Sequence, residues 1–281
     1  MPGIRVVADS ACDLPIEVIA EYRLTIVPLT IRVGPDDATE ASPQEFWAMC
    51  RASSALPETA APAPGAFVEA FRRLAADGAD GVVCMNLSSK LSATIESARA
   101  AAREVADLIA VRVVDTLSVS VGMGLQVIEA ARMAEAGKSL AEVADAAEAA
   151  PPRVHVYAAL DTLENLKKGG RIGGATALVG SMLSIKPVIE VAGGVVEQES
   201  KQRTRSKSLR YLCEKVAEAN AISPIDHLAV GHGDASDFDA FMSQVTEVVP
   251  AERVLVCWVG AVIGSHAGPG VIGLGWSSAE V

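Results

Sequence analysis

The sequence predicts an α/β fold in which an N-terminal parallel-sheet α/β domain is followed by a mixed-sheet α+β domain. In the first half, short runs rich in Val and Ile alternate with stretches of helical spacing, which is typical of a parallel sheet wrapped by helices. Pro151-Pro152 interrupts this alternation. Beyond it, two apolar runs flank Gly193-Gly194 and predict a hairpin, hence antiparallel pairing. We therefore expect two domains, 1–152 and 153–281.

The elements of the first domain follow from apolar spacing and from helix start signals. Ser42-Pro43-Gln44-Glu45 and Ser139-Leu140-Ala141-Glu142 are capping boxes. Pro28 cannot donate to a strand ladder, so the strand that contains it is expected at a sheet edge. The prolines in residues 56–64 predict an irregular segment. Strands are expected at residues 4–8, 25–33, 81–87 and 110–115. Helices are expected at 14–22, 42–52, 67–77 and 93–105. A long helix should follow the last of these strands and end near residue 137, and another should run from 139 to the double proline.

The second domain is expected to hold a mixed sheet with helices between some of its strands. Its strand candidates are residues 154–160, 188–191, 195–199, 227–232, 254–259 and 271–276.

Composition excludes several classes of function. Half of the 281 residues are hydrophobic but only 4% are aromatic, so the core must be largely aliphatic. The formal net charge of -11 disfavours nucleic-acid binding. Transient contact with an anionic membrane would require a local basic patch. The five scattered cysteines, the absence of an export signal and the lack of a long apolar stretch predict a cytoplasmic protein.

Common cofactor motifs give little support for a bound nucleotide or metal. No G-x-x-x-x-G-K-[ST] phosphate loop occurs. Residues 268–273 match G-x-G-x-x-G, but too few residues follow to complete a dinucleotide-binding unit. A metal site made of His227, His232 and Asp234 is a weak alternative. We expect neither a cofactor nor a metal.

Residues 88–92 connect a predicted strand to a predicted helix, where a parallel sheet exposes its carboxyl ends. Backbone N–H groups and a hydroxyl at such a helix start form a natural cradle for a carboxylate or a phosphate. Ser92 is therefore a candidate ligand-binding residue, although a simple helix-capping role is at least as common for serine. The two roles are compatible.

Two further candidates are less specific when each is taken alone. Thr59 lies in the proline-rich segment, where an exposed hydroxyl would be the default. His266 lies among glycines in residues 263–270, which suggests a backbone that approaches another group closely. Positive charge gathers at residues 167–171 and 201–207, either as solvated helix starts or as a docking patch for an acidic or phosphate-bearing partner.

Taken together and in order, these segments resemble the DegV family, whose members include the fatty-acid-binding subunit of bacterial fatty acid kinase. The resemblance covers nearly the whole chain. It rests on Asp9-Ser10 with Asp13-Leu14-Pro15, Val27-Pro28-Leu29, Thr59 to Pro62, Ser88-Ser89-Lys90-Leu91-Ser92, Val114-Asp115-Thr116, Asp161-Thr162-Leu163-Glu164, Lys168-Gly169-Gly170-Arg171, Ile185-Lys186-Pro187, Ile263-Gly264-Ser265-His266 and Gly268-Pro269-Gly270.

The resemblance implies a DegV-like fold and a ligand-presenting role. Thr59 and Ser92 would hydrogen-bond the carboxylate of a long-chain fatty acid, and His266 would lie near this head group and assist the chemistry. An ATP-binding kinase protein would phosphorylate the bound carboxylate for phospholipid synthesis, docking near Arg171, Arg203 and Arg205. The family often has Ser-Gln where this chain has Ala60-Ala61, a departure that could alter the head-group network.

Two other functions stay open at this point. The first is a serine hydrolase that uses Ser92 and His266 on acyl esters, although the G-x-S-x-G elbow is absent. The second is a lipid carrier without a kinase partner. For a fatty acid, burial of about fourteen methylenes at about 0.8 kcal/mol each would supply most of the affinity, and the polar residues would mainly set orientation.

Overall fold

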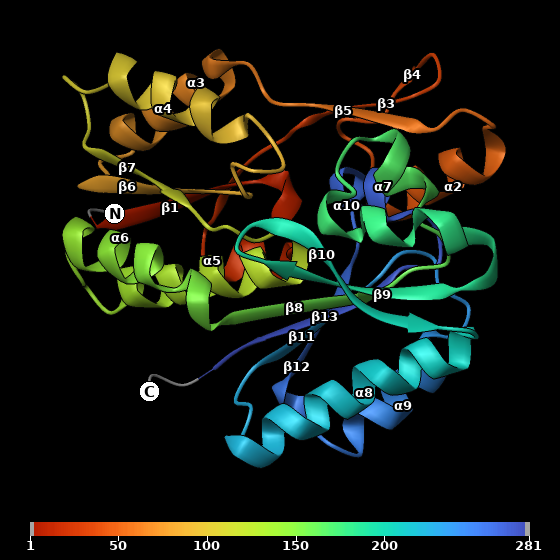
Figure 1. Ribbon diagram of the computed structural model, residues 1–281. Coiled ribbons are helices and arrows are strands. Elements are labelled where there is room, and N and C mark those ends of the chain that lie inside the picture. Colours follow the sequence, from red (N-terminus) through yellow and green to blue (C-terminus); the bar gives the residue numbers. More distant parts are fainter. Residues whose placement is uncertain (1–2, 279–281) are drawn as a thin grey trace.

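The computed structural model describes residues 3–278, with the side chains of residues 179–184 outside the description. Helices and sheets alternate in layers (Figure 1). Two helices cover one face of a first sheet, a second pair of helices lies on its other face, a second sheet follows, and a further helical layer covers that sheet on the outside. The predicted fold class is therefore confirmed.

The first sheet is four-stranded and wholly parallel, in the order β2-β1-β6-β7. From β1 the chain runs to β2 on one side and to β6 on the other, so the strand order reverses between β1 and β6. Ligands of open parallel sheets bind beside the carboxyl ends at such a reversal. The strands are β1 (Ile4–Asp9), β2 (Thr25–Val27), β6 (Gly81–Asn86) and β7 (Val111–Asp115).

Buried Asp9 ties the two strand ends at this reversal together. Its Oδ2 accepts hydrogen bonds from Asn86 Nδ2 at 3.2 Å and from Leu87 N at 2.8 Å. Burial raises the pKa of this carboxyl to about 6, against the lowering effect of those bonds. The loops that leave β1 and β6 are thereby held side by side.

The helices of the first half agree with the predicted pattern. Both capping boxes form, with each serine accepting from the backbone N–H of the glutamate three residues later. Helices α3 and α4 cover one face of the first sheet, and α5 and α6 cover the other. Their bounds are α1 (Ile16–Glu21), α3 (Pro64–Ala76), α4 (Thr94–Glu104), α5 (Ser120–Glu135) and α6 (Leu140–Ala149).

Residues 30–60 form an excursion from the first half, which we call the arm. It consists of β3 (Thr30–Val33), β4 (Asp36–Asp37), α2 (Pro43–Ala52) and β5 (Pro57–Ala60). The single strand expected at 25–33 is divided at Pro28, and β2 is an edge strand as predicted. The irregular segment expected at 56–64 is wrong, because β5 pairs antiparallel with β3. Proline is tolerated there because Pro57 is the first residue of the strand.

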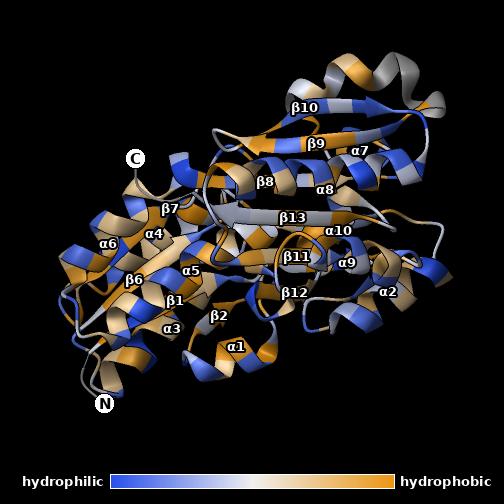
Figure 2. Cartoon of the chain, turned by 90° about the horizontal axis from the view of Figure 1, so that it is seen from below, coloured by the Kyte–Doolittle hydropathy of each residue, from blue (hydrophilic) through white to orange (hydrophobic). Residues whose placement is uncertain are grey.

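The second sheet has six strands in the order β10-β9-β8-β13-β11-β12. Only β11 and β12 run parallel, so the sheet is mixed as predicted. The hairpin at Gly193-Gly194 is confirmed, and Figure 2 shows its strand β9 as largely hydrophobic and β10 as largely hydrophilic. The strands are β8 (Val154–Ala159), β9 (Lys186–Ala192), β10 (Val195–Gln202), β11 (Leu228–His232), β12 (Val254–Trp258) and β13 (Ile272–Ser277).

The remaining helices lie around this sheet. Helix α8 packs across β8, β9 and β10 on the outer face, with α9 beside it. The helices are α7 (Glu164–Lys168), α8 (Arg205–Ile222), α9 (Phe238–Thr246) and α10 (Ala261–Ala267), with 3-10 turns η1 (Ser10–Cys12), η2 (Pro151–Arg153), η3 (Gly173–Ser184) and η4 (Ala251–Arg253). Among residues 3–278, no helix combines the length and apolar character needed to cross a bilayer.

The two faces of the second sheet belong to different hydrophobic clusters. Along β8, Val156 and Ala158 face the cluster shared with the first sheet, whereas Tyr157 and Ala159 face the cluster beneath α8. The shared cluster also contains Val6 of β1, so buried apolar contact is continuous across residue 152. The division into domains at that residue stays a prediction.

Helix α5 lies between the two sheets and approaches both closely through glycines. A Cβ at Gly122 would overlap Val156 of β8, and a Cβ at Gly124 would lie 2.8 Å from the carbonyl oxygen of Cys12. A backbone carbonyl moves less readily than a side chain. The spacing between the sheets, and hence the room between them, depends on these small residues.

We expect Gly124→Ala to lower the free energy of unfolding by about 1–3 kcal/mol, because the added methyl group overpacks α5 against the loop after β1. Chemical denaturation monitored by circular dichroism measures this change. Gly65→Ala is the matched control, since nothing lies within 4 Å of its Cβ position in helix α3, and it should be neutral or stabilising. Equal effects of the two substitutions would contradict the close packing.

Candidate functional site

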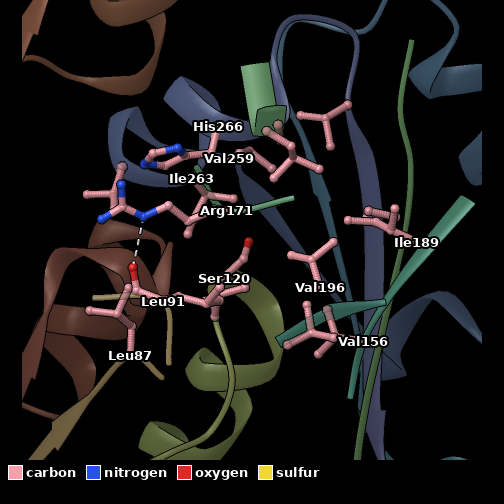
Figure 3. Close-up of a pocket in the computed structure, with 18 of the residues that line it drawn as sticks. Leu87, Leu91, Ser120, Val156, Arg171, Ile189, Val196, Val259, Ile263 and His266 are labelled. Atoms are coloured by element: carbon pink, nitrogen blue, oxygen red, sulfur yellow. Dashed lines mark hydrogen bonds between the residues drawn. The ribbon is translucent and has the colours of Figure 1, made fainter. Parts of the chain in front are cut away.

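A pocket lies between the start of α5 and the inner face of the second sheet, beside the carboxyl ends of β6 and β7. Its lining is divided by polarity. Figure 3 shows Arg171 and His266 at one end and aliphatic side chains from the second sheet at the other. Representative members of the aliphatic part are Val121, Val156, Ile189, Val191, Val196 and Val259.

The polar end brings together residues that are far apart in the sequence. Thr59 comes from β5 of the arm, Ser92 from the loop before α4 and His266 from α10, and all three line the pocket. Thr59 Oγ1 and His266 Nε2 are 3.0 Å apart, within hydrogen-bonding distance. The three predicted ligand-binding residues therefore share one site, although their roles toward a ligand stay predictions.

Ser92 lies just before α4, where the sequence left two roles open. Ala93 and not Ser92 is the N-cap of α4, but Ser92 Oγ accepts from the backbone N–H of Thr94, the first residue of the helix, at 3.3 Å and lies 2.9 Å from Thr94 Oγ1. The same residue lines the pocket. Since a hydroxyl has one donor and two acceptor positions, these contacts leave Ser92 with capacity for a ligand.

Arg171 lies in the pocket rather than free on the surface. Its Nε donates to the carbonyl oxygen of Leu91 at 3.0 Å, as Figure 3 shows, and Nη1 donates to the carbonyl oxygen of Gly169 at 2.7 Å. These bonds fix the guanidinium beside the polar end. A positive charge held there favours an anion in the pocket.

The two other predicted docking arginines differ from each other. Arg205 makes a bidentate ion pair with Asp237, with N–O distances of 2.9 and 3.0 Å, and is mostly buried. Arg203 is exposed at the end of β10. Docking of a partner requires an exposed side chain, and of these three arginines Arg203 is exposed.

His266 is held in its neutral form at pH 7. Burial, helped by the nearby charge of Arg171, lowers the pKa of its imidazole to about 4. The ring packs against Gly169, where any Cβ would overlap Nδ1. Gly169 therefore has a physical role in the motif Lys168-Gly169-Gly170-Arg171, because it lets the imidazole and the arginine lie at the same end of the pocket.

Sequence reasoning missed Ser120, which also lines the pocket. It begins α5 in a left-handed conformation with φ of 49°, which is strained for a residue with a Cβ. Its hydroxyl donates to Asp13 Oδ2 at 2.6 Å, and Gly260 N donates to Asp13 Oδ1 at 3.0 Å. Burial raises the pKa of Asp13 to about 7. The segment Asp13-Leu14-Pro15 was a recognisable signal, but nothing in the sequence pointed to Ser120.

The geometry does not favour the hydrolase alternative. In the described part of the chain, Ser92 Oγ bonds to Thr94, while His266 Nε2 faces Thr59. His266 Nδ1 is buried without a hydrogen-bond partner, whereas a catalytic triad would orient that atom with a carboxylate. The site is arranged for binding more than for proton relay.

The weak metal alternative is not assembled either. His227 Nε2 lies 3.0 Å from Arg132 Nη1, and the ring of His232 lies between those of Phe238 and Trp258. Asp234 forms an ion pair with Arg51. Across residues 3–278, no group of three or more His, Cys, Asp or Glu side chains could hold a metal ion.

The chain matches the family described as "Uncharacterised protein, DegV family" over residues 3–279. A DegV domain-containing protein of Streptomyces coelicolor is 39% identical, and the alignment covers 98% of each chain. The structure of a fatty-acid-binding DegV family protein from Thermus thermophilus is similar, with a TM-score of 0.87, 33% identity and coverage of 99% of this chain and 100% of that one.

Two further solved structures agree with these matches. DegV of Bacillus subtilis, described as a fatty acid binding protein, has a TM-score of 0.88 at 27% identity, with 99% of each chain covered. A stearic-acid-binding protein from Eubacterium ventriosum has a TM-score of 0.84 at 27% identity, with 98% of each chain covered. Sequence and fold thus agree over nearly the whole chain, and the chain belongs to the DegV family.

Proposed function

We propose that this protein binds a long-chain fatty acid, with its carboxylate at Thr59, Ser92 and His266 and its tail along the second sheet. The observation that carries the proposal is the division of one pocket into a polar, positively charged end and an aliphatic end. Fatty acid binding by the DegV proteins of Thermus thermophilus and Bacillus subtilis supports it.

The chemistry of the polar end suits a carboxylate. An ionised carboxylate only accepts hydrogen bonds, and the hydroxyls of Thr59 and Ser92 both donate. Neutral His266 can donate its one N–H, at Nε2, to Thr59 Oγ1, which leaves the threonine proton for the carboxylate without the cost of a buried second cation. Arg171 supplies the compensating charge, and a buried carboxylate without such partners would be strongly disfavoured.

The aliphatic end suits the tail and supplies most of the binding energy. Full burial of about fourteen methylenes would contribute at most about 11 kcal/mol, whereas each hydrogen bond to a charged group contributes about 1.5–3 kcal/mol. The tail therefore sets affinity, and the polar end selects an acid and fixes its direction.

Removing one carboxylate donor should weaken the binding of acids and spare that of esters. We expect Thr59→Val to reduce affinity for palmitate about tenfold or more, with little change for methyl palmitate, after ligand extraction by organic solvent. Isothermal titration gives both affinities, and mass spectrometry of the extract identifies any fatty acid that co-purifies. Thr246→Val, which alters an exposed hydroxyl on α9, is the control. Equal losses for acid and ester would contradict the head-group assignment.

Gly273 on β13 offers a way to shorten the tail site. A Cβ there would make only ordinary contacts, 3.4 Å from Tyr157 O and 3.7 Å from Ala158 Cβ, and the residue lines the pocket. We expect Gly273→Leu to fill this space and to shift the bound fatty acids toward shorter chains in competition experiments read by mass spectrometry. Leu274→Met, on the opposite face of the same strand, should leave the profile unchanged. An unaltered profile in Gly273→Leu would argue against a tail at this strand.

The finer part of the proposal is that the bound carboxylate is presented to an ATP-dependent kinase protein. In that step a carboxylate oxygen attacks the γ-phosphorus of ATP, an acyl phosphate forms and ADP leaves. The resemblance to the subunit of fatty acid kinase supports this role, as does an exposed arginine on an acidic protein. Arg171 serves the pocket in this proposal, and Arg203 serves docking.

For the kinase step, Arg203→Ala should keep palmitate affinity and lower acyl-phosphate formation several-fold at limiting kinase, because docking loses a surface charge. A coupled ADP assay with the kinase of the same organism measures the rate. Arg73→Ala on α3 removes an exposed charge from the outer face of the first sheet and serves as the control. Unchanged turnover in Arg203→Ala would refute docking there, and a ligand-bound protein that accepts no phosphate would favour a lipid carrier.

A further inference from the structure

We infer that Trp47 is a positioning residue that locks the arm onto α10, so that Thr59 meets His266 at the polar end of the pocket. The inference rests on the proposed function, in which Thr59 and His266 hold the carboxylate. It concerns the arm, residues 30–60, which carries Thr59 away from the first sheet and toward the second half of the chain (Figure 1).

The arm has no backbone ladder to either large sheet within residues 3–278. Its strands β3, β4 and β5 pair only with one another, as a separate three-stranded sheet. Within it, Thr59 is opposite Ile31. The position of Thr59 relative to α10 therefore depends on side-chain packing rather than on strand register.

Trp47 supplies packing with a defined direction. Its side chain is fully buried, and its Nε1 donates to the carbonyl oxygen of Val259 at 2.9 Å. Val259 directly follows β12 and lies two residues before α10. A tryptophan ring has only two rotatable side-chain bonds, so one hydrogen bond and a close-fitting socket fix it well.

The space that holds the indole of Trp47, which we call the socket, exists because Gly233 and Gly264 lack a Cβ. A Cβ at Gly264 would lie 2.7 Å from Trp47 Cζ2 and 2.8 Å from Phe46 Cε1. A Cβ at Gly233 would lie 2.5 Å from Trp47 Cζ2 and 2.6 Å from Val271 Cγ1. Phe46 meets Trp47 edge-on with ring centroids 5.0 Å apart. The indole thus fills a space that any larger residue at either glycine would remove.

The same short helix carries both the socket and His266. Gly264 is two residues before His266 in α10, and β5 also packs against α10. Any shift of the indole in its socket therefore moves Thr59 relative to the imidazole. Apart from the Trp47 bond and the Thr59–His266 contact itself, the described residues give the arm one more polar link to this region, the Arg51–Asp234 ion pair, which is largely exposed and is a weak anchor by comparison.

The alternative is that Trp47 merely adds to the hydrophobic core. A core role predicts that disturbing the socket lowers stability and leaves the head-group chemistry alone. A positioning role predicts a change at the polar end in a folded protein. The wedge substitution Gly233→Ala separates these roles, because Gly233 lies outside the pocket lining and the atoms nearest to its added Cβ belong to Trp47 and to Val271. Val271 itself lines the pocket, so the experiment includes a rescue at Trp47.

The experiment uses the full chain after ligand extraction, with palmitate and methyl palmitate as probes. Gly233→Ala should lose about tenfold in palmitate affinity with little change for the ester, and so imitate Thr59→Val. Adding Trp47→Phe to Gly233→Ala should raise the acid affinity to that of Trp47→Phe alone, because the smaller ring leaves room for the methyl group. Rescue by Trp47→Phe would show that the methyl group acts by displacing the indole, because displacement of Val271 would persist in the double variant.

A second readout needs no ligand. The imidazole of His266 should titrate near pH 4 in the parent protein by NMR, with the signal assigned by its loss in His266→Gln. In Gly233→Ala this midpoint should rise, because a displaced arm admits water beside the ring, and adding Trp47→Phe should return it to the value of Trp47→Phe alone. If Gly233→Ala fails to fold, Trp47→Phe alone, which loses the bond to Val259, must lower acid affinity and raise the titration midpoint.

The inference is overturned if Gly233→Ala folds with acid affinity and His266 titration at parent values, or if Trp47→Phe does not rescue it. It is also overturned if acid and ester affinities fall equally. Failure of the proposed function gives a different pattern. The parent protein would then show no preference for the acid over the ester, while the His266 titration would still respond to the wedge and to its rescue.

Discussion

The contact between Thr59 and His266 joins the two halves of the chain at the polar end of the pocket. The two residues are separated by 207 positions in the sequence, and they meet only because the arm crosses from the first half of the chain to α10. Burial holds the imidazole neutral, so the contact is a hydrogen bond between uncharged groups. A neutral histidine and two hydroxyls can accept a carboxylate without crowding a second cation beside Arg171.

Charge is distributed in a way that favours one anion in one place. The protein as a whole is acidic, with a formal net charge of -11, yet a guanidinium is fixed at the polar end of the pocket by two backbone carbonyls. A general negative field discourages polyanions from binding elsewhere. At short range in a partly dry pocket, the single arginine outweighs that field.

Close approaches of backbone shape the pocket as much as its side chains do. Gly122 and Gly124 let α5 lie between the sheets, and Gly169 lets the imidazole lie against a backbone. At these three positions an added methyl group would overlap a neighbour, whereas at Gly273 on β13 it would make only ordinary contacts. Branched aliphatic side chains on the inner face of the second sheet line the apolar end of the pocket, in agreement with the aliphatic composition of the chain.

Sequence alone determined the fold class, the capping boxes, the Gly-Gly hairpin and the family, because each depends on local patterns or on ordered motifs. It also named Thr59, Ser92 and His266, but only through the resemblance, since single hydroxyls and a single histidine carry little local signal. Tertiary structure alone decided that residues 57–60 form a strand, that Arg171 lies in the pocket and that Ser120 lines it. Strand pairing in the arm, the inward direction of an arginine and the aliphatic wall all depend on contacts between distant segments, and a core residue and a pocket residue look identical until those contacts are made.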